Sequence, residues 1–121
     1  ECKGTAKHEN TDEHSKIRNH KKTIVLGDFN AKSTMWGAPN TDERGEVMME
    51  MLASLDFVCH NLNKPTFQRN SSLSYIDVTC SSTDLCNKIS NWDVLDTEST
   101  SLHKYIYIEI NGKELKAQTR S

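Results

Sequence analysis

TIVLGDFN, at residues 23–30, joins a short apolar run to a polar cluster and decides the fold class. The first four residues are β-branched or apolar, which predicts a short buried strand. The strand runs directly into Gly27, Asp28 and Asn30. If the extended backbone continues, side chains two residues apart leave the same face, so a carboxylate and an amide would share one pocket.

This pair of polar side chains has two interpretations. An acid that manages a water or a hard cation, beside an amide that sets its direction, suits an oxygen-rich chemical site. Alternatively, Asp28 and Asn30 only close a turn after Gly27, because both residue types favour turns. The spacing alone leaves both interpretations open.

The rest of the pattern predicts one helix and several strands. Thr41 or Asp42 can cap a helix that starts near Glu43. This helix carries an apolar stripe at helical spacing, formed by Val47, Met48, Met51, Leu52 and Leu55. Further strands are expected over 57–62, 65–67, 74–80, 92–95 and 104–110, with a hairpin turn over 68–73 and a short helix over 82–89. This order favours a layered α/β unit.

Length and composition bound the remaining possibilities. The 121 residues leave room for one domain, and 35% apolar residues suffice for a modest core. The net charge of −2 is spread along the chain without a polybasic tail. No uninterrupted apolar run exceeds four residues, so a membrane-spanning helix, which needs about 20, is not expected. Residues 1–22 are polar and expected to be disordered, and residues 111–121 are expected to form a linker stub.

The four cysteines show no zinc-binding pattern. They stand at positions 2, 59, 80 and 86, with no C-x-x-C pair. Cys59 and Cys80 fall inside apolar runs, so reduced, buried thiols are favoured over a disulfide framework.

Asp77 is an ionisable residue inside an otherwise apolar strand. A buried carboxylate needs a partner, because burying an unpaired charge is costly. His103, just before the last predicted strand, is one candidate, and an Asp–His pair fixes the tautomer of the ring. The alternative is a hydrogen bond to a turn or to a nearby Ser or Thr hydroxyl.

The sequence also carries an ordered series of short motifs. They are Ile24-Val25-Leu26-Gly27-Asp28-Phe29-Asn30-Ala31, Trp36-Gly37, Asp42-Glu43-Arg44-Gly45, Pro65-Thr66-Phe67, Ser74-Tyr75-Ile76-Asp77-Val78-Thr79 and Ser101-Leu102-His103-Lys104-Tyr105-Ile106. In this order they resemble the C-terminal half of a LINE-type (non-LTR) retrotransposon endonuclease domain, in the endonuclease/exonuclease/phosphatase superfamily. The resemblance covers residues 23–110. It implies part of a layered α/β sandwich, two packed β-sheets flanked by helices, with the N-terminal half missing.

The resemblance implies a Mg²⁺-dependent nuclease that nicks one DNA strand and leaves a 3′ hydroxyl to prime reverse transcription. In the family, the residues matching Asp28 and Asn30 handle the attacking water. The residue matching His103 meets the scissile phosphate and is oriented by the one matching Asp77. Such roles agree with the chemistry, because phosphodiester hydrolysis builds negative charge that a cation and a donor imidazole stabilise.

The resemblance further implies binding partners. The hairpin tip, which includes Asn70 and Ser71, would probe the groove of the target DNA. Basic side chains that would contact phosphates are Lys32, Arg44, Arg69 and Lys104. A reverse transcriptase domain would follow in the same polyprotein, and a functional protein would be intracellular and act in the nucleus. No membrane is expected.

Two departures from the family pattern lower the expected activity. The family ends its site with Ser-Asp-His, whereas this chain has Leu102 before His103, and leucine can neither bind a hard cation nor carry negative charge. The family's metal-binding Glu lies upstream of every matched motif, so the metal ligands stay unknown. We therefore expect a truncated copy with weak or no nuclease activity. The alternative is a non-catalytic remnant that at most binds DNA or a protein partner.

Overall fold

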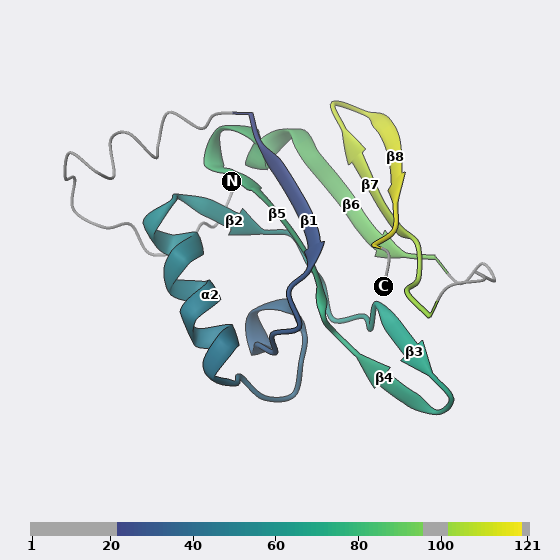
Figure 1. Cartoon of the computed structure of the whole chain (residues 1–121). Helices are drawn as coiled ribbons and strands as arrows, with labels where there is room; N and C mark the ends of the chain where they lie inside the picture. The colour runs from purple at the N-terminus through teal and green to yellow at the C-terminus, as the bar shows by residue number, and fades with distance from the viewer. Residues whose placement is uncertain (1–21, 96–101, 120–121) are drawn as a thin grey trace.

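Three antiparallel sheets and one α-helix form the described part of the chain (Figure 1). The structure is a computed structural model that describes residues 22–95 and 102–119. The strands are β1 (Ile24–Asp28), β2 (Phe57–Cys59), β3 (Phe67–Arg69), β4 (Ser72–Ser74), β5 (Asp77–Ser82), β6 (Ile89–Val94), β7 (Ile106–Ile110) and β8 (Lys113–Ala117). The helices are the α-helix α2 (Glu43–Ser54) and the 3₁₀ helices η1 (Thr34–Trp36) and η2 (Thr83–Lys88).

The strand predicted from residues 23–30 is β1. It pairs antiparallel with β5, which lies between β1 and β2 in the first sheet. The register of the β1–β5 ladder places Asp28 directly opposite Asp77 at the end of the ladder. Cross-strand partners project from the same face of a sheet. The two carboxylates therefore start from neighbouring positions.

The second sheet has the order β6-β7-β8, and β8 corrects the sequence-based interpretation. Residues 111–121 were expected to form a linker stub, but Lys113–Ala117 pairs with β7 along its whole length. The turn between them is Asn111-Gly112, in which both residues have positive φ. An Asn-Gly pair with this geometry joins two antiparallel strands, so the dipeptide continues the sheet rather than ending it.

Helix α2 starts where the sequence predicts, but it buries a different face. The Asp42 side chain accepts a hydrogen bond from the Gly45 N–H and caps the helix. Met48 and Leu52 are buried, whereas Val47 is 65% exposed and Met51 is 46% exposed. Two residues of the predicted apolar stripe, Val47 and Met51, therefore do not contribute to the core.

Two apolar cores lie on opposite faces of the first sheet. Val78 and Cys80 of β5 pack with Met48 and Leu52 of α2 in one core. The other core is formed mainly by β6, β7 and η2, and the alternate β1 residues at 24 and 26 pack against it. The layers are thus helix, sheet and sheet, which confirms the expected layered α/β sandwich.

The strands near Asp77 are shorter than predicted, for a local reason. Asn61 follows β2, and its side chain accepts from the Thr79 N–H and donates to the Asp77 carbonyl. The side-chain amide of Asn61 thus makes two hydrogen bonds to the main chain of β5, in place of the bonds that a longer β2 would make there. The hairpin predicted around residues 68–73 is confirmed as β3–β4, but the strand predicted over 74–80 is divided between β4 and β5.

The cysteine and membrane expectations have mixed outcomes. Cys59 and Cys80 are free thiols, and burial raises the pKa of Cys59 to about 11 and that of Cys80 to about 12. Cys86, by contrast, is disulfide-bonded, against the preference for reduced cysteines.

Within residues 22–95 and 102–119, no helix has the length and apolar character required to cross a membrane.

Candidate active site

Asp77 and His103 form a buried pair. Asp77 is the first residue of β5, and His103 lies just before β7, where it forms an isolated β-bridge with Phe67. His103 Nδ1 lies 2.9 Å from Asp77 Oδ2, and each side chain is 1% exposed. Of the two partners considered for Asp77, the structure places the imidazole there and adds a hydroxyl, that of Thr119.

Hydrogen bonds to the main chain of Asp77 and a ring contact of His103 fix this pair. The Asp77 N–H donates to Thr66 Oγ1 at 3.1 Å, and the Asp77 carbonyl accepts from Asn61 Nδ2 at 2.9 Å. The ring of Phe67 meets the His103 ring edge-on, with 4.9 Å between the ring centroids. These contacts come from two separate segments, residue 61 and residues 66–67, so the pair is held by the fold rather than by one loop.

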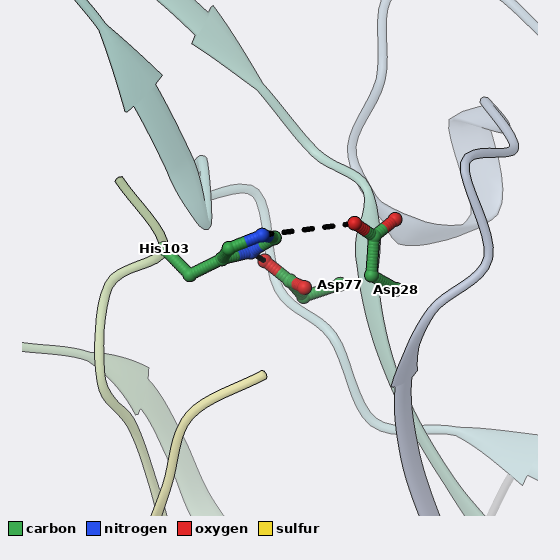
Figure 2. Close-up of side chains that lie close together, drawn as sticks. All are labelled: Asp28, Asp77 and His103. Atoms are coloured by element: carbon green, nitrogen blue, oxygen red, sulfur yellow. Dashed lines mark hydrogen bonds and ion pairs between the residues drawn. The ribbon is translucent and has the colours of Figure 1, made fainter. Parts of the chain in front are cut away.

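Asp28 lies near the other nitrogen of the same imidazole (Figure 2). Its Oδ2 lies 3.7 Å from His103 Nε2, and its side chain is 28% exposed. The two ring nitrogens therefore face different carboxylates, a buried one at Nδ1 and a solvent-accessible one near Nε2. An accessible acid beside a buried, oriented imidazole is an arrangement suited to proton transfer and to binding an anionic group.

Asn30 does not share this pocket in the way its spacing predicts. Its backbone has a φ of 49°, so the extended geometry ends before it. The Asn30 N–H donates to Asp28 Oδ1 at 2.9 Å. This side-chain-to-backbone bond is typical of an Asx turn. The turn interpretation thus describes the backbone, while Asp28 also faces His103.

The loop after Asp28 is anchored on the start of α2. Asp42 Oδ1 accepts from the main-chain N–H groups of Lys32 and Gly45, and these bonds lower the pKa of Asp42, that from Gly45 most strongly. A Cβ on Gly45 would lie 1.8 Å from the Lys32 carbonyl oxygen, which leaves room for glycine alone. The Asp42-Glu43-Arg44-Gly45 motif therefore has a structural role through its first and last residues.

Comparison with known proteins identifies the family. A family model described as endonuclease-reverse transcriptase matches residues 5–107, most of the chain. The chain belongs to this endonuclease-reverse transcriptase family. No curated protein matches the chain. The match extends further toward the N-terminus than the motifs that carry the resemblance to retrotransposon endonucleases.

A solved structure supports the same assignment. The chain is similar to the endonuclease domain of TRAS1, a telomere-specific non-LTR retrotransposon, at 32% identity and a TM-score of 0.70. The alignment covers 79% of this chain and 48% of the TRAS1 domain, so the chain spans about half the length of that relative. The predicted resemblance to non-LTR retrotransposon endonucleases is confirmed.

Three donor residues form the cluster that could hold Mg²⁺. Donor atoms of Asp28, Asp77 and His103 all lie within 4.8 Å of one another. However, Asp77 is buried, its two carboxylate oxygens already accept hydrogen bonds, and Mg²⁺ prefers oxygen to imidazole nitrogen. The donor set therefore fits Mg²⁺ only through Asp28.

The residues predicted to contact DNA fall into two groups. Arg69, Asn70 and Ser71 are exposed on the β3–β4 hairpin, which projects from the body of the molecule (Figure 1). The Gln68 N–H donates to the Leu102 carbonyl, which ties this hairpin to the segment that carries His103. The structure thus places the hairpin beside the candidate site.

The remaining predicted DNA contacts have different settings. Lys104 is half-buried directly after His103, and its N–H donates to the Thr66 carbonyl. Lys32 and Arg44 are exposed in the loop after β1 and in the first turn of α2, and Arg44 lines an open groove with Phe29. Their roles in DNA binding remain predictions.

Leu102 is 45% exposed directly before His103. Its carbonyl contributes to the β3–β4 connection, but its side chain supplies no polar atom near the imidazole. Position 102 is therefore outside both apolar cores and offers no carboxylate beside His103.

Four polar residues at the site escaped the sequence-based prediction. Thr66 lies in the Pro65-Thr66-Phe67 motif, which contributes to the family resemblance but does not indicate what Thr66 does. Asn61 follows a predicted strand and looks like an ordinary loop residue. Gln118 and Thr119 lie in the segment expected to be a linker, and nothing in their local sequence indicates contact with His103.

Proposed function

We propose that this chain carries part of a DNA endonuclease site that hydrolyses a phosphodiester bond. One observation carries the proposal: the two ring nitrogens of His103 face the buried carboxylate of Asp77 and the accessible carboxylate of Asp28. The assignment to a family with endonuclease members and the likeness to a retrotransposon endonuclease domain support it.

The geometry suggests a division of roles. Asp77 accepts the Nδ1 proton of His103, so Nε2 is directed toward Asp28 and toward solvent beyond it. With a second proton on Nε2, in the imidazolium form, the ring would donate a hydrogen bond to a phosphate placed there as charge builds on its non-bridging oxygens. Asp28 would accept a proton from the attacking water, and the Asn30 N–H would orient the carboxylate.

The expected cofactor and partners follow from this role. Mg²⁺, held by Asp28 together with phosphate oxygens and water, would supply positive charge against the phosphate. Arg69 and Lys104 would contact DNA phosphates on the hairpin side, with Lys32 and Arg44 on the side of α2. A reverse transcriptase in the same polyprotein and action in the nucleus are part of the proposal.

We further propose that the activity is low. Leu102 stands where the resembling endonucleases carry an acid, and Asp28 is the one member of the cluster suited to a hard cation. A positioned acid–base group contributes about 10² to 10⁴ in rate. Slow nicking is therefore expected from this chain.

The test is nicking of supercoiled plasmid with Mg²⁺, compared with the same reaction in EDTA. Wild-type nicking should be slow, and His103→Ala should abolish it. Leu102→Asp should raise the rate about 100-fold, at the low end of the range for one catalytic group. Leu115→Asp is the matched control, because Leu115 is similarly exposed at 41% but lies on β8.

The outcomes separate the parts of the proposal. Equal nicking by wild type and His103→Ala would reject the His103 site. Fast nicking by wild type would reject low activity and retain the endonuclease. An equal gain from Leu102→Asp and Leu115→Asp would show a general charge effect instead of a restored site.

A second candidate is DNA binding without cleavage. Leu102 beside the histidine favours it, because the hairpin and its basic residue are kept while one acid is lost. A gel-shift titration across salt concentrations should then show DNA affinity that falls steeply with salt. In a plot of the logarithm of the binding constant against the logarithm of the salt concentration, Arg69→Ala should reduce the slope by about 1. A shift that is absent or independent of salt would remove this candidate.

A further inference from the structure

The chain after β8 returns to the histidine–carboxylate pair. Gln118 Nε2 donates to the His103 carbonyl at 2.7 Å. The Thr119 hydroxyl donates to Asp77 Oδ1 at 2.5 Å, and the same oxygen lies 2.8 Å from His103 Nδ1. Two consecutive residues thus contact the main chain of His103, its ring and its carboxylate partner.

We propose that Thr119 is a positioning residue that keeps the proton of the neutral His103 ring on Nδ1, with Gln118 anchoring the histidine main chain. The catalytic meaning of this role rests on the proposed endonuclease function. The positioning itself rests on the contacts of residues 118 and 119 with Asp77 and His103.

The hydrogen-bonding capacity of a hydroxyl defines the arrangement. Thr119 has one proton to donate, and the carboxylate of Asp77 can only accept, so the Thr119 proton lies toward Asp77. A lone pair of the same oxygen then faces Nδ1 of His103. Asp77 Oδ2 accepts from that nitrogen as well. Two acceptors therefore converge on one ring nitrogen, and both require a proton there.

The tautomer that carries its proton on Nε2 has weaker hydrogen bonding in this site. With its proton on Nε2, the neutral ring would face Asp28 Oδ2 at 3.7 Å, which is too long for a hydrogen bond. The Nδ1 nitrogen would meanwhile face a carboxylate oxygen without a proton between them. Thr119 thus favours the form in which Nδ1 is protonated and Nε2 is directed to the substrate side.

Thr119 acts on the carboxylate without being needed for the strand. The main chain of Asp77 is fixed separately by Thr66 and Asn61. Loss of the Thr119 hydroxyl should therefore release the rotation of the Asp77 carboxylate and remove one acceptor from Nδ1, while β5 stays in place. Removing the Thr119 hydroxyl should therefore change the proton exchange and the tautomer of His103 without unfolding the chain.

The experiment compares Thr119→Val, which removes the hydroxyl and keeps the shape, with Thr119→Ser, which keeps the hydroxyl. NMR of the ¹⁵N-labelled chain measures the exchange rate of the Nδ1 proton and the tautomer of His103, assigned through loss of its signals in His103→Ala. Removing one of two acceptors should speed proton exchange about tenfold in Thr119→Val. Thr119→Ser should match wild type.

Thr34→Val is the matched control, because the Thr34 hydroxyl faces Thr41, away from the pair. It should leave the His103 signals unchanged. If Thr119→Val has wild-type proton exchange and tautomer, the positioning role is overturned. A native amide spectrum in Thr119→Val shows that a changed histidine does not result from unfolding.

Nicking adds an independent readout in the Leu102→Asp background. Thr119→Val should lower kcat about tenfold with KM unchanged, and Thr119→Ser should restore kcat. If no variant nicks DNA, the endonuclease proposal fails, but the NMR comparison still decides the positioning role. If nicking occurs and Thr119→Val leaves kcat unchanged, the catalytic meaning of Thr119 is overturned.

Discussion

The two carboxylates that face His103 are held by different kinds of structure. On the Nδ1 side, Asp77 is buried, and its main chain and side chain are bonded to Asn61, Thr66 and Thr119. On the Nε2 side, Asp28 is partly exposed and its carboxylate is bonded to the loop that follows it. Asp77 therefore orients the imidazole and contributes to stability, whereas Asp28 is the carboxylate that a substrate can reach.

This difference separates two kinds of mutational effect. A change at the buried carboxylate or at its histidine should alter both stability and chemistry, because buried charges and their partners contribute to the fold. A change at the accessible carboxylate should alter chemistry with little effect on stability. The predictions below test that separation, beginning with the strongest effect.

His103→Ala should give the largest loss of stability. It leaves the Asp77 carboxylate buried without its imidazole partner, which costs about 3–5 kcal/mol of unfolding free energy. Urea denaturation of wild type and variant measures the difference. His60→Ala is the matched control, because His60 bonds a neutral hydroxyl, that of Ser81, at 2.7 Å, and should lose only about 1 kcal/mol. Equal losses would contradict a special role for the buried Asp77–His103 pair.

Gly45→Ala should break the support of the accessible side. The added Cβ would meet the Lys32 carbonyl oxygen at 1.8 Å, so α2 and the loop after Asp28 must separate, at a cost of about 1–3 kcal/mol. Gly27→Ala is the control, since its Cβ meets only the Phe29 side chain, at 3.2 Å, and that ring can move. A loss from Gly27→Ala as large as that from Gly45→Ala would contradict the close backbone approach as the cause.

Much of the buried side of the site could be predicted from the sequence. Asp77 stands among apolar residues, so its burial and its need for a partner follow from the cost of an isolated charge. His103 could be named as that partner because it is the histidine next to the last apolar strand of the family pattern. The layered fold followed in the same way from β-branched runs and one capped helix.

The rest depended on tertiary contacts that the local sequence does not encode. The polar segment after Asn111 was interpreted as a linker, although Asn-Gly also favours the hairpin that forms there. Thr119 contacts Asp77 although 42 positions separate them in the chain, and no hydrophobic pattern in the sequence indicates such a long-range contact. Likewise, the face that α2 buries depends on which side meets the sheet, and Val47 and Met48 cannot be distinguished by spacing alone.

Asp28→Asn should have the smallest effect on stability, and it tests the accessible side most directly. The amide oxygen can still accept from the Asn30 N–H, and the side chain is partly solvated, so the free energy of unfolding should change by less than about 0.5 kcal/mol. Nicking in the Leu102→Asp background should nevertheless fall by about 10² or more, because an amide cannot take a proton from water. Urea denaturation and plasmid nicking on the same preparation measure both quantities. If Asp28→Asn instead destabilises the chain as much as His103→Ala, the two carboxylates form one buried unit and the separation between orientation and access is wrong.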